Sequence, residues 1–274
     1  MISGAAQVAG IAGWPVKHSR SPRLHNHWIA RHGLDAAYVP LPIAPEDFTT
    51  AVRGLAAAGL RGMNVTIPHK EAAFALCDDI TPRARRAGAV NTLVFEAGRI
   101  AGDCTDGVGF LASLGPGFDA RRGPAVLLGA GGAARAVAAA LLDAGCPRLT
   151  LVNRSRPRAE ALAAALGGPV AVAEAPPLED AALLVNTTSL GMQGQPPLTL
   201  DLSPLPAQAL VADIVYVPLE TPLLAAARAR GLETVGGLGM LLHQAVPGFA
   251  AWFGITPVVD EEVEALLAAD SPRT

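Results

Sequence analysis

The chain has 274 residues, of which 51% are hydrophobic and 16% charged, and its formal net charge is -3. The apolar content excludes a disordered chain, and the small negative charge gives no electrostatic reason to expect nucleic acid or an anionic membrane as a partner. A small-molecule partner fits this composition better. A chain of this length lies where single cores begin to split, so two domains are predicted.

The cysteines and the N-terminus argue for a reducing, cytoplasmic setting. Cysteine occurs three times, without CxxC spacing, so neither a disulfide framework nor a structural zinc site is expected. Residues 1–13 show no basic segment followed by a long apolar one, so no secretion signal is predicted. The histidines have no recognisable ligand spacing, and no metal is expected.

The first hundred residues alternate short apolar runs with helical segments. Strands are predicted at residues 8–13, 37–41, 62–66 and 89–95, and helices begin near Pro22 and Pro45. This alternation is typical of an α/β sheet. We expect residues 1–105 to form an α/β substrate-binding domain.

The next segment repeats the alternation around a glycine-rich turn. Strands are predicted at 124–128, 149–153, around Val170, at 183–186 and at 210–214, helices at 133–144 and 157–166, and a loop at 188–206. Strands joined by helical crossovers favour a parallel sheet, so residues 106–240 are predicted to form a doubly wound, Rossmann-like domain. Helices from Leu238 and at 258–269 are expected to return to the first domain, which residues 241–274 then complete.

The turn Gly129-Ala130-Gly131-Gly132-Ala133-Ala134 follows a predicted strand and opens a predicted helix. Glycines allow the backbone to approach a pyrophosphate closely, and the helix N-terminus offers it unpaired N–H groups. The alternative is a turn that only packs a helix on a strand.

A second signal comes at the end of the following strand, which reads Asn153-Arg154-Ser155. NAD-binding folds place an acidic residue there for the adenosine ribose. Here no carboxylate would repel a 2'-phosphate, and Arg154 and Arg158 could bind one, so NADP is favoured over NAD. The alternative is that both arginines are only solvated surface residues.

Polar side chains follow the predicted strands of the first domain, where ligand crevices form. They suit a polyhydroxylated acid, and they are Ser19, Ser21, Asn64, Thr66, Lys70, Asn91 and Asp106. Each alone is ambiguous, because Ser21 could be only a helix N-cap and a lone lysine is usually a surface residue.

Seven motifs occur in order along nearly the whole chain. They are SxSPxxHN at 19–26, NVTxPxK at 64–70, AVNT at 89–92, TDGxG at 105–109, GAGGAAR at 129–135, NR at 153–154 and GLGMLLHQA at 237–245. In this the sequence resembles the shikimate dehydrogenase family.

The resemblance implies a role for each matching residue. Lys70 is the implied catalytic proton carrier and Asp106 its catalytic partner, which also contacts a ring hydroxyl. Ser19 and Ser21 are implied to bind the substrate carboxylate, with further substrate contacts from Asn64, Thr66, Asn91, Tyr216 and Gln244. The implied cofactor positions are Gly129, Ala130, Gly131, Gly132, Ala133, Asn153, Arg154, Arg158, Ile214 and Gly237.

The implied activity is the NADP-dependent, reversible reduction of 3-dehydroshikimate to shikimate in chorismate and aromatic amino-acid biosynthesis, by a monomer or homodimer. Two alternatives stay open: an NAD-dependent enzyme for quinate and shikimate, and a non-catalytic NADP-binding regulatory protein on the same scaffold. Cys104 stands where the family commonly has Asn, and His69 where Phe is frequent. Both are expected to be tolerated variants.

Overall fold

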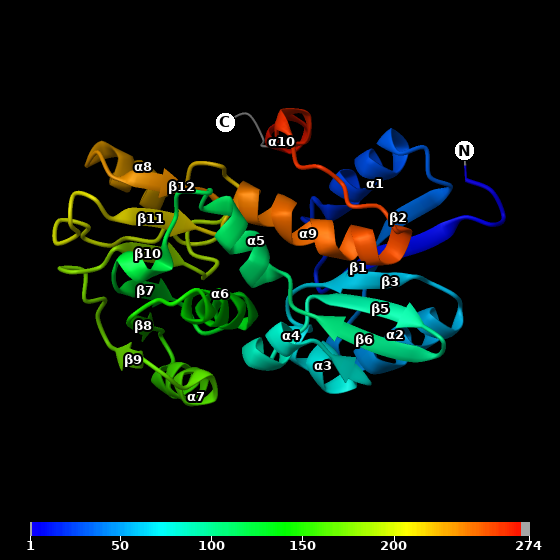
Figure 1. The fold of residues 1–274 in the computed structure, drawn as a ribbon, viewed down its shortest axis with the longest axis horizontal. Helices are drawn as coiled ribbons and strands as arrows, with labels where there is room; N and C mark the ends of the chain where they lie inside the picture. Colours follow the sequence, from blue (N-terminus) through cyan, green and yellow to red (C-terminus); the bar gives the residue numbers. More distant parts are fainter. Residues whose placement is uncertain (1, 270–274) are drawn as a thin grey trace. The chain divides into compact units, whose positions relative to one another are not determined.

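The computed structural model describes residues 2–269 and divides them into two compact units (Figure 1). The first unit contains residues 2–106 and 244–267, and the second contains residues 107–243 and 268–269. Part of the predicted C-terminal segment 241–274, namely residues 270–274, lies outside the described residues. Within the described chain, no helix is long and apolar enough to cross a membrane.

The first unit is built on a mixed six-stranded sheet. Its order is β2 (Ala36–Pro42), β1 (Gln7–Gly13), β3 (Gly62–Val65), β5 (Thr92–Glu96), β6 (Arg99–Asp103) and β4 (Asp79–Ile80). The strands β2, β1 and β3 are parallel, whereas β5 runs antiparallel to both β3 and β6. Because β5 is antiparallel to β3, the first residue of β5 lies beside the end of β3.

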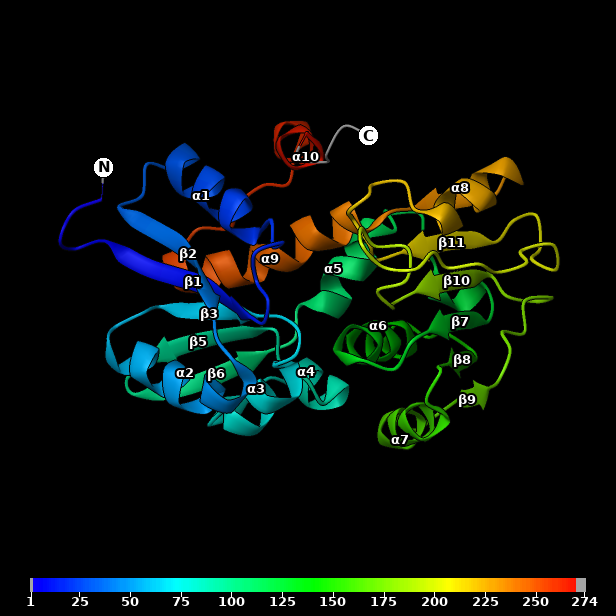
Figure 2. The same cartoon turned by 180° about the vertical axis from the view of Figure 1, so that it is seen from behind.

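Helices cover both faces of this sheet. They are α1 (Ser21–Arg31), α2 (Phe48–Ala57), α3 (Lys70–Leu76), α4 (Pro82–Ala87), α10 (Glu261–Ala268) and the end of α9 (Gly237–Phe253). Figures 1 and 2 show α9 on one face and α2 with α3 on the other. Between α1, β2 and α9 lies a buried aromatic core of Trp28, Tyr38, Phe249 and Trp252.

The second unit is built on a fully parallel six-stranded sheet. Its order is β12 (Glu233–Val235), β11 (Leu210–Asp213), β10 (Leu183–Asn186), β7 (Ala125–Leu128), β8 (Leu149–Val152) and β9 (Val170–Ala173). Its helices include α5 (Asp106–Ser113), α6 (Gly132–Asp143), α7 (Arg156–Leu166) and α8 (Pro222–Ala229). This order confirms the predicted doubly wound fold, whose direction of winding reverses between β7 and β10. Ligands bind such sheets at that point, beyond the carboxyl ends of the strands.

Some predicted boundaries are wrong, and local hydrogen bonds explain why. The strand predicted at 89–95 begins only at Thr92, because the Val90 N–H donates to the Lys70 carbonyl of α3 at 3.0 Å. The helix predicted from residue 258 begins at Glu261, because the Asp260 side chain accepts a hydrogen bond from the Val263 N–H. The elements β4 and α3 have too few residues for a recognisable period, and β6 reads RIAGD, which contains no apolar run.

The first prediction concerns Gly62, where β3 passes directly under α9. A Cβ atom there would lie 2.1 Å from the Leu93 carbonyl oxygen and 2.3 Å from Trp252 Nε1, which donates a 2.9 Å hydrogen bond to that oxygen. We expect Gly62→Ala to lower the free energy of unfolding by about 1–3 kcal/mol, measured by urea denaturation.

Gly54 provides the matched control, because it lies inside α2 and a Cβ there would have no neighbour within 4 Å. Gly54→Ala should leave stability unchanged or raise it by up to about 1 kcal/mol. Equal unfolding free energies for the two variants would contradict the packing described for Gly62.

Candidate functional site

The reversed direction of β5 gathers polar residues at one edge of the first sheet. Asn64, near the end of β3, pairs with Thr92 at the start of β5, and Thr92 pairs with Asp103 at the end of β6. The end of β3, the start of β5 and the end of β6 therefore lie side by side. The segments that follow β3 and β6 carry Lys70 and Asp106.

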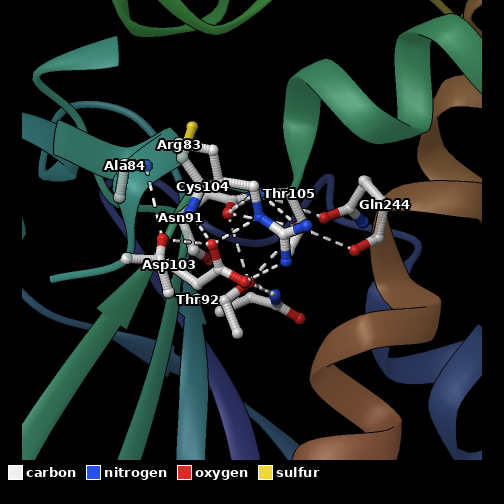
Figure 3. Close-up of polar contacts among 10 residues, drawn as sticks. Arg83, Ala84, Asn91, Thr92, Asp103, Cys104, Thr105 and Gln244 are labelled. Atoms are coloured by element: carbon white, nitrogen blue, oxygen red, sulfur yellow. Dashed lines mark hydrogen bonds and ion pairs between the residues drawn. The ribbon is translucent and has the colours of Figure 1, made fainter. Parts of the chain in front are cut away.

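Asn91 is the centre of a buried hydrogen-bond network at this edge (Figure 3). Its amide nitrogen lies within hydrogen-bonding distance of three oxygens: Asp106 Oδ1 at 2.9 Å, Thr105 Oγ1 at 3.0 Å and Gln244 Oε1 at 3.2 Å. Its Oδ1 accepts from the Thr105 N–H at 2.8 Å. The Thr105 hydroxyl donates to the Gln244 carbonyl at 2.7 Å. One asparagine thus joins the start of α5 to α9.

Lys70 and Asp106 form an ion pair, each at the first residue of a helix. The Lys70 ammonium donates to Asp106 Oδ2, while Oδ1 accepts from Asn91. Their side chains are only 14% and 7% exposed, so water screens the pair little. Because Asp106 is held from two sides, it can fix the position of the Lys70 nitrogen, which keeps further N–H groups for a ligand.

A second ion pair anchors the segment that leads into Asp106. The Asp103 carboxylate accepts from Arg83 Nε at 2.6 Å, from the Thr81 hydroxyl at 2.7 Å and from the Cys104 N–H at 2.7 Å. Burial opposes ionisation of Asp103, but these donors, Arg83 foremost, hold its pKa below the ordinary value. Figure 3 shows Arg83 reaching Asp103 beside the Asn91 network.

The serines form a separate group after β1. Ser21 is buried within the first turn of α1, where its N–H donates to the Ser19 hydroxyl at 3.2 Å. The residue before the helix is Arg20, so Ser21 is not the N-cap. Thr66 adjoins this group, because its N–H donates to the Ala12 carbonyl at the end of β1 at 2.9 Å.

The two departures from the family pattern are both buried. His69 stacks on Phe48, with ring centroids 4.5 Å apart, and its Nε2 lies 2.8 Å from the Ile43 carbonyl oxygen. Burial lowers the pKa of His69 and raises that of Cys104 to about 12. Cys104 therefore carries a neutral thiol, and Asp106 receives its hydrogen bonds from Asn91 and Lys70 instead.

The glycine turn of the second unit follows β7 at the point where the winding reverses. Gly129 has φ +118°, and a Cβ there would lie 2.6 Å from Thr187 Oγ1, so both backbone and packing require glycine. Gly131 precedes the first residue of α6, and a Cβ there would have no neighbour within 4 Å. Ala130 is buried, while Gly132 and Ala133 form the first residues of α6, whose N–H groups are available to an anion.

Asn153, Arg154 and Arg158 lie near this turn through the strand register. Leu128 of β7 pairs with Val152 of β8, so Gly129 and Asn153 follow at the same sheet edge. The two arginines are exposed, and neither has an ion-pair partner within residues 2–269. By contrast, Arg156 between them pairs with Glu160 at 2.8 Å and with Glu174 at 3.3 Å.

The remaining cofactor candidates lie beyond β11. The Gly237 N–H donates to the Val215 carbonyl at 3.2 Å, and a Cβ on Gly237 would lie 2.1 Å from the Ile214 carbonyl oxygen. Tyr216 is two residues further along the same segment and belongs to the second unit, whereas the other substrate candidates belong to the first.

Several residues that shape these sites were not identified from the sequence. Asp213, at the end of β11, accepts hydrogen bonds from Asn186 at 2.9 Å and from Thr221 at 2.8 Å. Burial raises the pKa of Asp213 against the effect of these donors. A carboxylate at the end of a buried apolar strand was the available signal for Asp213. The ion pair of Asp103 with Arg83 had no local sequence signal, because the two residues are 20 positions apart.

No cluster of His, Cys, Asp or Glu that could bind a metal occurs among the residues that the structure describes.

Comparison with known proteins gives two family matches. Residues 11–93 match the shikimate dehydrogenase substrate binding domain, and residues 117–189 match shikimate / quinate 5-dehydrogenase. A shikimate dehydrogenase (NADP(+)) from Rhodospirillum rubrum is 63% identical over 277 residues, which cover 97% of this chain and 98% of the relative.

Solved structures agree with these matches. Shikimate dehydrogenase from Aquifex aeolicus superposes with a TM-score of 0.89 at 36% identity, covering 99% of this chain and 100% of that one. The Thermus thermophilus enzyme, solved in complex with NADP(H) and shikimate, gives a TM-score of 0.85 at 38% identity, covering 96% and 98% of the two chains.

The second prediction concerns the Asn91 network. Asn91→Asp would place a second buried carboxylate beside Asp106, and like charges at that separation repel strongly. The variant should therefore lose about 2–4 kcal/mol of unfolding free energy at pH 8. Repulsion raises the folded-state pKa of the introduced carboxyl above its unfolded value of about 3.9, so the loss should shrink as the pH falls from 8 to 5.

The control is Asn91→Leu, which removes the hydrogen bonds of the amide without adding a charge. Its deficit relative to the wild type should stay constant over this pH range, as followed by thermal unfolding. An equally constant deficit for Asn91→Asp would contradict the proximity of Asn91 to Asp106.

Proposed function

This chain belongs to the shikimate dehydrogenase family, and on that premise we propose that it reversibly reduces 3-dehydroshikimate to shikimate with NADP, using Lys70 and Asp106 for the proton. Its relatives at 59–63% identity are named NADP-dependent shikimate dehydrogenases. The observation that carries the assignment of residues is the ion pair of the partly buried Lys70 with the buried Asp106, which Asn91 holds at a sheet edge lined with polar side chains.

Lys70 is the residue that transfers the proton. Bound NADP supplies the hydride acceptor for oxidation of a secondary alcohol and the hydride donor in the reverse direction. During oxidation the neutral Lys70 amine takes the hydroxyl proton and becomes the ammonium that Asp106 stabilises. During reduction the Lys70 ammonium donates a proton to the carbonyl oxygen and becomes the neutral amine. Asp106 keeps the nitrogen in place and stabilises its positive charge, while Asn91 holds Asp106.

The two polar clusters of the first unit bind different parts of the substrate. Ser19 and Ser21, with the N–H groups that open α1, bind the carboxylate through neutral donors. Ring hydroxyls are bound by Asn64, Thr66, Asn91, Asp106 and Gln244, and Tyr216 is a further substrate contact. We accordingly assign residues 1–105 and 241–274 to substrate binding and 106–240 to NADP.

The cofactor residues fit a dinucleotide phosphate. Open space beside Gly131 leaves room for a pyrophosphate at the N-terminus of α6, and the unpaired Arg154 and Arg158 suit a 2'-phosphate. Asn153 is fixed by its 2.8 Å hydrogen bond to the Ser155 carbonyl. Gly129, Ala130, Gly132, Ala133, Ile214 and Gly237 complete the cofactor site.

The scattered cysteines suit a cytoplasmic enzyme. We also propose that the enzyme acts as a monomer or homodimer.

The third prediction tests the proton carrier. Lys70→Ala should lower kcat by about 10²–10⁴-fold while shikimate binding stays measurable, because the general acid-base group is lost. Asp106→Ala should also lower kcat by orders of magnitude. Steady-state oxidation of shikimate with NADP+ measures both effects.

Lys17, the other lysine of the chain, provides the control because it is exposed. Lys17→Ala should keep kcat near that of the wild type. Near-normal turnover by Lys70→Ala would rule out Lys70 as the proton carrier.

The fourth prediction tests the phosphate site. Arg154→Gln should raise KM for NADP+ by roughly 10–100-fold, since a charge-assisted hydrogen bond contributes about 1.5–3 kcal/mol. KM for NAD+, which has no 2'-phosphate, should stay unchanged.

Arg156→Gln is the matched control, because this neighbouring arginine is engaged with Glu160 and Glu174. It should leave both KM values unchanged. If Arg154→Gln changed the KM values for NADP+ and NAD+ equally, Arg154 would not be the 2'-phosphate ligand.

A further inference from the structure

Tyr38 is a buried residue that none of the roles above includes. It lies on β2, the outermost strand of the first sheet, with an exposed fraction of 2%. Its hydroxyl lies 2.6 Å from Asn64 Oδ1, so it touches a side chain that we assign to a substrate hydroxyl. Burial raises the pKa of Tyr38 well above its ordinary value, and the phenol therefore keeps its proton.

The neighbours of Asn64 determine the direction of this hydrogen bond. Asn64 Nδ2 lies 3.3 Å from the Asn91 carbonyl oxygen and 3.2 Å from Thr92 Oγ1. A carbonyl oxygen can only accept, so the amide nitrogen must face Asn91 and the amide oxygen must face Tyr38. The Tyr38 hydroxyl is consequently the donor, and Asn64 is held from both ends of its amide.

The Tyr38 ring is itself fixed in place. It stacks on His25 with centroids 4.1 Å apart and an interplanar angle of 7°, and the Trp252 ring lies 5.9 Å away. Its backbone N–H and carbonyl both bond to the Asn26 side chain, at 3.0 Å and 2.8 Å. Burial lowers the pKa of His25 to about 3, although the nearby Asn64 side chain opposes part of the shift, so the stacked imidazole is neutral.

We propose that Tyr38 is a positioning residue for substrate binding, which acts by fixing the amide of Asn64 through its hydroxyl group. The proposal rests on the proposed function, which gives Asn64 a substrate hydroxyl to bind. Asn64 is only 4% exposed, so little water can replace a lost partner of its amide oxygen. Without the phenol, the amide oxygen has an unsatisfied lone pair and the side chain is free to leave its binding orientation.

The test is a double-mutant cycle of Tyr38→Phe and Asn64→Ala, with steady-state kinetics in shikimate and in NADP+. Tyr38→Phe keeps the ring and its stack, so its melting temperature should stay close to that of the wild type. Its KM for shikimate should rise about tenfold, with kcat and the KM for NADP+ nearly unchanged. In the Asn64→Ala background, Tyr38→Phe should cause no further rise, because the side chain through which it acts is gone.

Thr150→Val is the control for loss of a buried hydroxyl, because Thr150 lies on β8 of the second unit. It should leave the KM for shikimate unchanged. If Asn64→Ala leaves that KM unchanged, the assignment of Asn64 in the proposed function fails. If Asn64→Ala raises it but Tyr38→Phe does not, or if the two effects multiply in the double variant, Tyr38 is not a positioning residue.

Discussion

The candidate substrate site depends on the hydrogen bonds of one buried amide, that of Asn91. Through them the start of β5, the start of α5 and the middle of α9 share a single fixed point. The amide can do this because β5 runs against β3 and β6, which brings three chain segments to one edge of the sheet. A fully parallel sheet would have placed the start of β5 at the opposite edge, away from Asn64 and Asp106.

Burial also determines which side chains around this network are neutral and which are charged. It shifts the pKa values of His25 and His69 downward and those of Tyr38 and Cys104 upward, so all four groups stay neutral near pH 7. The two ion pairs beside the network are Lys70 with Asp106 and Arg83 with Asp103. Neutral hydrogen-bonding groups around the Lys70 and Asp106 pair suit a single proton transfer to or from a polyhydroxylated ligand.

The fold around the candidate cofactor residues was predictable from local sequence, whereas the contacts among the candidate substrate residues were not. The glycine turn, the helix after it and Arg154 are read from one continuous strand-turn-helix-strand segment, and the observed sheet order confirms that fold. The pairing of Lys70 with Asp106 spans 36 residues and depends on β6, whose sequence RIAGD contains no apolar run that would mark it as a strand. Only the family resemblance suggested that pair. The hydrogen bond from Tyr38 to Asn64 depends on the neighbouring positions of β2, β1 and β3, which no local pattern specifies.

Initial-rate assays of the purified protein with shikimate and with quinate, each with NADP+ and with NAD+, test the central claim most directly. We expect kcat/KM to be highest for shikimate with NADP+, because Arg154 and Arg158 have no ion-pair partner within residues 2–269 and can bind a 2'-phosphate, and because Asp106 positions Lys70 for proton transfer. A clear preference for NAD+ would contradict the cofactor assignment. Binding of NADP without turnover of either acid would contradict the assignment as an enzyme.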